Sequence, residues 1–65
     1  MSLQVGDHIW TRAAESSEIK EWTICNAAES HRVGCRETRG HGFCDMTWLA
    51  VGDFYLSVEE ATFIV

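Results

Sequence analysis

Apolar and polar residues alternate along most of this chain, in short runs that small or acidic residues interrupt about every ten positions. Alternation with a period of two matches the two faces of a β-strand, whereas an amphipathic helix needs a period of about 3.6. No proline breaks any of the runs. The pattern therefore predicts strands over residues 5–12, 19–25, 31–38, 43–51 and 54–58, and a strand-like end over residues 63–65.

Turn residues separate the predicted strands. Gly40 and Gly42 lie in the segment Arg-Gly-His-Gly, which predicts the tightest hairpin of the chain over residues 39–42. Ser57 and Glu60 have the spacing of a capping box, which predicts one helical turn after the last long strand. The main alternative is a sheet with one short helix, across residues 13–19 or residues 27–30.

The first predicted strand begins with Val-Gly-Asp-His-Ile-Trp, and a long loop, three further strands and a closing turn follow it. This order resembles that of SH3-like barrels. We therefore predict an all-β fold, a small five- to six-stranded SH3-like barrel with at most one short helical turn, in a single domain over residues 1–65. Because 65 residues bury only a small core, we also expect self-association as a homodimer.

The cellular location follows from the cysteines and from the apolar runs. Three cysteines are an odd number, which favours free thiols in a reducing compartment, so we predict a cytoplasmic protein. No apolar run reaches the roughly 18 residues that a membrane span requires. The first residues also lack the basic and apolar regions of a secretory signal.

The formal charge is −5, and it is distributed unevenly. Residues 31–41 hold three arginines against one glutamate, a net of +2, which leaves −7 on the rest of the chain. An acidic body argues against general binding to nucleic acid, which requires a basic face, and suits a basic protein surface instead. We therefore predict a small acidic protein-interaction module, acting as an inhibitor or accessory factor on a larger protein partner.

Five residues are the candidates for partner binding. Arg32 and Arg36 share one face of a predicted strand, opposite the face of Val33 and Cys35, which we assign to the core. Trp10 shares its face with a histidine rather than with the aliphatic residues of its strand, so it is a candidate interface residue, whereas we expect the other two tryptophans in the core. The candidates are Trp10, His8, Arg32, Arg36 and Arg39.

The alternative function uses the histidines and cysteines of residues 31–44. His31, Cys35, His41 and Cys44 form two closely spaced pairs, with glycines between them, and zinc takes four such nitrogen and sulfur ligands. Cys25 is a substitute for one member of the set. This segment therefore also suits a structural-zinc or nucleic-acid-binding β module. Zinc is the cofactor of this alternative, and no cofactor is expected for the interaction module.

Catalysis is the third class of function. Cys44 with His41 or His31, and with Asp45 nearby, has the residue types of a thiol nucleophile, its base and an orienting group. No nucleophile signature surrounds these residues, and the chain is too short to enclose a substrate. We therefore predict that the protein is not an enzyme.

Overall fold

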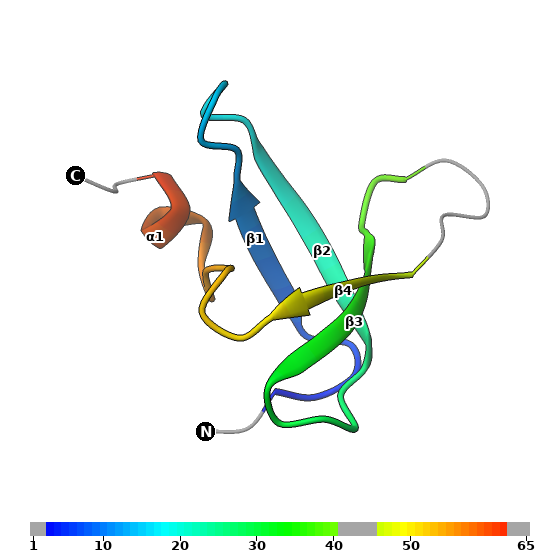
Figure 1. The fold of residues 1–65 in the computed structure, drawn as a ribbon. Coiled ribbons are helices and arrows are strands. Elements are labelled where there is room, and N and C mark those ends of the chain that lie inside the picture. The colour runs from blue at the N-terminus through cyan, green and yellow to red at the C-terminus, as the bar shows by residue number, and fades with distance from the viewer. Residues whose placement is uncertain (1–2, 41–45, 63–65) are drawn as a thin grey trace.

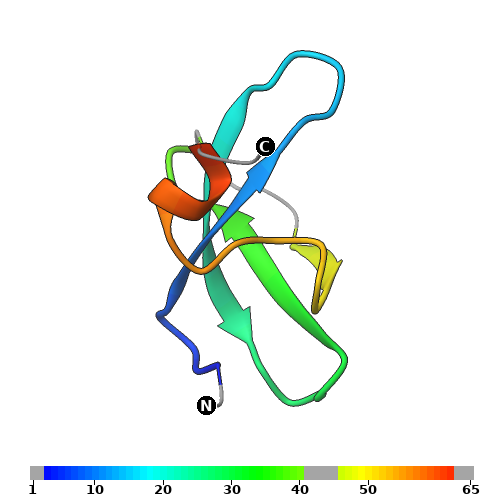
Figure 2. The same ribbon diagram turned by 90° about the vertical axis from the view of Figure 1, so that its left-hand side faces the viewer.

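The computed structural model describes residues 3–40 and 46–62. These residues form four strands and one helix: β1 (His8–Arg12), β2 (Ile19–Asn26), β3 (Arg32–Glu37), β4 (Thr47–Ala50) and α1 (Val58–Thr62) (Figure 1). The strands form one antiparallel sheet in the order β1-β2-β3-β4, so each strand pairs with its neighbour in sequence. The sheet is strongly curled, and the helix packs beside β1 (Figure 2).

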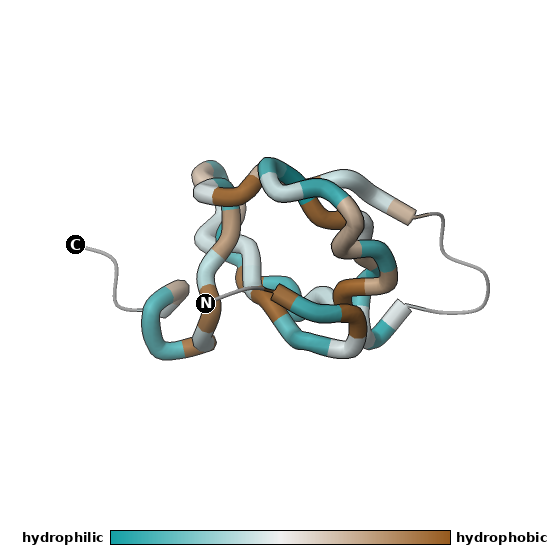
Figure 3. The backbone as a smooth tube through the Cα atoms, turned by 90° about the horizontal axis from the view of Figure 1, so that it is seen from below, coloured by the Kyte–Doolittle hydropathy of each residue, from teal (hydrophilic) through white to brown (hydrophobic). Residues whose placement is uncertain are grey.

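The core lies on the inner face of this curled sheet, and the alternation of the sequence explains which side chains reach it. Hydrophobic and hydrophilic residues follow one another along the curled backbone (Figure 3). Val33 and Cys35 both point inward, as predicted, and each is at most 2% exposed. Burial of a side chain of the size of valine or isoleucine contributes roughly 1.5–3 kcal/mol. The buried residues of the cluster are Ile9, Ile24, Val33, Cys35 and Phe54, with Leu3, Trp22, Ala27 and Leu49 half-buried against them.

The register between β2 and β3 changes near the end of β2. Ile24 pairs with Cys35, but the next pair joins Asn26 to Gly34, so Cys25 is an extra residue on β2. Such a bulge increases the local twist of a sheet. The bulge therefore contributes to the curl that brings β4 around the core.

The helix begins where the sequence predicts it. The backbone N–H of Glu60 donates to Oγ of Ser57 at 3.2 Å, which is the first half of the predicted capping box. The helix has five residues, far fewer than the roughly 20 of a membrane span, and no other helix is present in the described ranges. Ala61 is its one fully buried residue.

The prediction of five to six strands is wrong for the described part of the chain, which contains four. The predicted strand over residues 54–58 is reduced to one bridge, in which the backbone N–H groups of Trp10 and Tyr55 donate to each other's carbonyls at 2.9 and 2.7 Å. Helix α1 then begins at Val58 and ends the extended conformation. The mostly β fold with one short helix is confirmed.

Two other local predictions are also corrected. The first strand begins at His8 rather than residue 5, because Gly6 has a φ of 99° and forms a turn that leaves Val5 exposed. The alternative helices are absent, since residues 14–16 form a turn and residues 27–30 are irregular. The N–H of Gly40 donates to the carbonyl of Glu37, which begins a turn after β3, and the rest of the predicted hairpin lies outside the described residues.

Candidate interaction surfaces

The register of the sheet places Trp48 on the outer face. Residues directly opposite one another on antiparallel strands share a face. Because Val33 pairs with Leu49 on the core side, Gly34 and Trp48 pair on the outer side. Trp48 is 37% exposed, so the prediction that it lies in the core is wrong. Trp22 packs against the core, as predicted.

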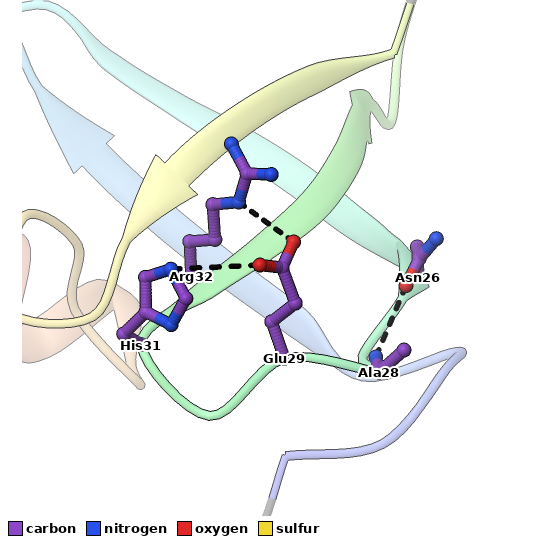
Figure 4. Close-up of polar contacts among 5 residues, drawn as sticks. All are labelled: Asn26, Ala28, Glu29, His31 and Arg32. Atoms are coloured by element: carbon purple, nitrogen blue, oxygen red, sulfur yellow. Dashed lines mark hydrogen bonds and ion pairs between the residues drawn. The ribbon is translucent and has the colours of Figure 1, made fainter.

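Arg32 lies over the indole ring of Trp48. Its guanidinium carbon is 4.1 Å from the ring centroid, and its Nε donates to Oε2 of Glu29 at 2.7 Å. The other carboxylate oxygen of Glu29 is 3.5 Å from Nε2 of His31, so the carboxylate lies between the two side chains (Figure 4). Each exposed contact of this kind contributes about 1 kcal/mol or less. Their main effect is to restrict the conformations of Arg32 and Trp48 on the surface.

Met46 also belongs to this surface, where it packs on the backbone of Gly34. Gly34 is buried, and a Cβ added to it would lie 2.5 Å from Sδ of Met46 and 3.1 Å from Cβ of Asn26. The thioether therefore occupies the space that any side chain at position 34 would need. Arg36 lies on the same outer face, because it pairs with Thr23 two residues further along β3. We call Arg32, Arg36, Met46 and Trp48 the Trp48 patch.

Four carboxylates lie in two segments, the β1–β2 loop and the first turn of α1, and none has an ion-pair partner in residues 3–40 or 46–62. Arg12 holds their two segments together, since its Nη1 donates to the carbonyl of Ala61 at 3.2 Å and its Nη2 donates to Oγ of Ser17 at 3.3 Å. The β1–β2 loop and the end of α1, which lies beside β1 (Figure 1), are thereby linked through one side chain. We call this surface the acidic end; it consists of Glu15, Glu18, Glu59 and Glu60.

An open hollow of about 400 Å³ adjoins the acidic end. Trp10, Ile19 and Val58 supply its apolar lining. Its polar lining contains one side-chain pair, in which Nζ of Lys20 lies 3.6 Å from Oε1 of Glu37, and it also contains Glu21, whose Oε2 lies 3.0 Å from Nδ1 of the neighbouring His8. The polar lining residues are Glu18, Lys20, Glu21, Glu37 and Arg39.

The predicted partner-binding residues fall on two surfaces. Trp10 and Arg39 line the hollow, whereas Arg32 and Arg36 belong to the Trp48 patch. His8 lies between them, in an outer row with Thr23 and Arg36 across three strands. Four exposed apolar residues were not predicted from the sequence as interface residues: Met46, Trp48, Leu56 and Val58. Alternation alone cannot select them, because their exposure depends on the register and on the end of the sheet.

The predicted zinc ligands in the described residues do not converge. His31 is exposed beside Glu29, and Cys35 is buried, with its Sγ 3.4 Å from the carbonyl oxygen of Thr47. Four residues of extended chain separate the two Cα atoms by roughly 13 Å. His41 and Cys44 lie outside the described residues, and within residues 3–40 and 46–62 no group of three metal-ligating side chains forms.

Cys35 has the environment of a structural thiol. Burial raises its pKa to about 11, and the nearby Cys25 contributes in the same direction. The thiolate is the reactive form of cysteine, so Cys35 is a poor nucleophile at neutral pH. The other candidates for catalysis, Cys44, His41 and Asp45, lie outside the described residues. None of the family models, curated proteins and solved structures compared with this chain matches it.

Proposed function

We propose that this protein is a small acidic interaction module that covers a basic surface of a larger protein, as an inhibitor or accessory factor. The observation that carries the proposal is that a hollow lined by Trp10 and Val58 adjoins the acidic end, whose carboxylates have no ion-pair partner among the described residues and of which Glu18 lines the hollow. One surface thus offers both negative charge and an aromatic ring. Lysine and arginine are the side chains that use both.

We expect a cationic side chain of the partner to enter this hollow. Its aliphatic stem packs against Ile19 and Val58, and its charged head lies over Trp10 and near Glu18. A cation over an indole contributes about 0.5–1 kcal/mol when exposed and about 2 kcal/mol when water is excluded. Arg12 fixes the two acidic segments in advance, which reduces the entropy lost on binding.

The same proposal extends to the class of fold and the setting. We infer an SH3-like barrel with fewer strands than usual, in which the reciprocal hydrogen bonds between Trp10 and Tyr55 replace a full closing strand. We also propose a binding role rather than an enzymatic one, in the cytoplasm. The buried, protonated thiol of Cys35 suits a reducing compartment.

The test uses synthetic 12-residue peptides rich in lysine or arginine and matched peptides rich in glutamate. Fluorescence anisotropy measures binding at low and high salt, and the NMR signal of the Trp10 indole N–H reports the location. We expect the basic peptides alone to bind, with affinity that falls as salt rises. Trp10→Ala and the double variant Glu59→Lys/Glu60→Lys should each weaken binding several-fold.

The matched control is Asp7→Lys, at the other end of β1 from Arg12. If it weakens binding as much per reversed charge as the double variant of α1 does, then only the net charge matters and the proposed surface is wrong. No binding of basic peptides at millimolar concentration, or equal binding of the acidic peptides, would also contradict the proposal.

A further inference from the structure

The Trp48 patch has the composition of an interface and is held in place before any partner arrives. Met46 and Trp48 are each 37% exposed, although both lie in contact with ordered neighbours, Met46 on Gly34 and Trp48 under Arg32. Tryptophan, methionine and arginine are the residue types most enriched in the centres of protein interfaces. An indole that is already restricted loses less entropy when it is buried.

The charge of the patch argues against contact with an identical patch. Arg32 is paired with Glu29, but Arg36 is exposed and has no ion-pair partner among residues 3–40 and 46–62. A two-fold contact places the same surface on both subunits, so it would bring Arg36 of each copy to one interface. Like charges facing each other oppose association. The complementary surface must therefore be acidic.

The chain itself carries such a surface at α1. Leu56 is 51% exposed and Val58 is 43% exposed, and Glu59 and Glu60 follow directly in the first turn of the helix. This segment combines apolar and negative side chains, whereas the Trp48 patch combines apolar and positive ones. Within one molecule α1 packs beside β1, whereas the Trp48 patch lies on β3 and β4, so the two segments belong to different parts of the sheet (Figures 1 and 2).

We propose that the Trp48 patch binds the α1 end of a second copy of this chain. Trp48 and Met46 pack against Leu56 and Val58 of the second copy, and Arg36 faces its glutamates. Because the two contacting surfaces differ, one copy of a bound pair retains a free α1 end and the other retains a free Trp48 patch. Association is then head-to-tail and open, rather than the closed homodimer expected from the chain length.

The inference goes beyond the proposed function, because the occupant of the patch is a second copy and not a basic partner. Both interactions use Glu59 and Glu60, so they exclude each other. Self-association thus masks the acidic end at high protein concentration, and a basic partner releases single chains. This competition is a regulatory consequence of the arrangement.

Two variants with complementary defects test the proposal. Trp48→Ala/Arg36→Glu removes the patch and keeps the α1 end, while Glu59→Lys/Glu60→Lys removes the α1 end and keeps the patch. Sedimentation velocity over a range of concentrations should show wild-type oligomers that grow with concentration and dissociate in high salt. Each double variant alone should associate at least tenfold more weakly than the wild type.

The decisive sample is an equimolar mixture of the two variants. A head-to-tail contact predicts a 1:1 heterodimer that grows no further, because each partner has only one working surface. Asp7→Lys is the control and should associate like the wild type, and circular dichroism of every variant verifies its fold.

Four outcomes would overturn the proposal. These are a monomeric wild type at high micromolar concentration, unchanged association of the α1 variant, unchanged association of the patch variant, and a mixture without heterodimers. Binding of basic peptides to the monomeric patch variant is measured separately. Failure of self-association and failure of the proposed function are therefore distinguishable.

Discussion

Replacement of Gly34 by alanine tests the register of β3 and β4 and the geometry of the Trp48 patch together. Gly34 does not have a positive φ, so its backbone accepts an alanine without strain. The new methyl group would lie 2.5 Å from Sδ of Met46 and 3.1 Å from Cβ of Asn26. Met46 can swing away because it is partly exposed, but Cβ of Asn26 moves only with the backbone of β2.

Two opposing terms decide the size of the effect. Overpacking typically costs about 1–3 kcal/mol. Replacement of glycine reduces the conformational entropy of the unfolded chain, which stabilises the fold by about 0.4–1 kcal/mol. We therefore expect Gly34→Ala to lower the free energy of unfolding by about 1 kcal/mol, which corresponds to a fall in melting temperature of roughly 4–8 °C for a domain of this size.

A double-mutant cycle with Met46→Ala makes the test specific. In the wild type, Met46→Ala removes a partly buried side chain and should destabilise the protein. In the Gly34→Ala background the same change removes the clash with the thioether and leaves only the 3.1 Å contact with Cβ of Asn26, so it should restore part of the stability and the two effects have opposite signs. Thermal denaturation followed by circular dichroism measures all four proteins. A neutral Gly34→Ala, or an effect of Met46→Ala that does not depend on residue 34, would show that the thioether does not lie on Gly34.

Four further predictions concern other parts of the molecule. Burial raises the pKa of Cys35 from 9.0 to about 11, so its protonated thiol stabilises the fold below pH 9. Denaturant melts of the wild type should therefore show a free energy of unfolding that falls between pH 9 and 11, and melts of Cys35→Val should not. Arg12→Met should lower the free energy of unfolding by about 1 kcal/mol and increase the rate of amide hydrogen exchange in α1 more than in the sheet. An equal increase in α1 and in the sheet would argue against the role of Arg12 as a helix cap. Metal analysis of the purified protein should find zinc far below one ion per chain. One zinc ion per chain would instead support the predicted ligand set that includes His31. Random single-stranded RNA and DNA should not bind with low-micromolar affinity at roughly 50 mM salt; such binding, lost at roughly 200 mM, would favour the nucleic-acid alternative.

Local patterns in the sequence were sufficient for much of the sheet. The central residues of β2 and β3 were predicted from the alternation, and so was the inward direction of Val33 and Cys35. The start of α1 follows from Ser57 and Glu60, three residues apart. These features depend on neighbours within a few positions, and periodicity and capping report on such neighbours.

The tertiary structure decided the features that depend on distant residues. Trp48 faces outward because β4 pairs with β3 in one particular register, and a shift of one residue would have turned Leu49 outward instead. The extended segment around Tyr55 stops after a single bridge to β1, and Arg12 caps a helix 49 residues further along the chain. Both surfaces proposed for binding arise from such contacts, since register, closure and long-range capping are properties of the assembled sheet and leave no periodic mark on the sequence.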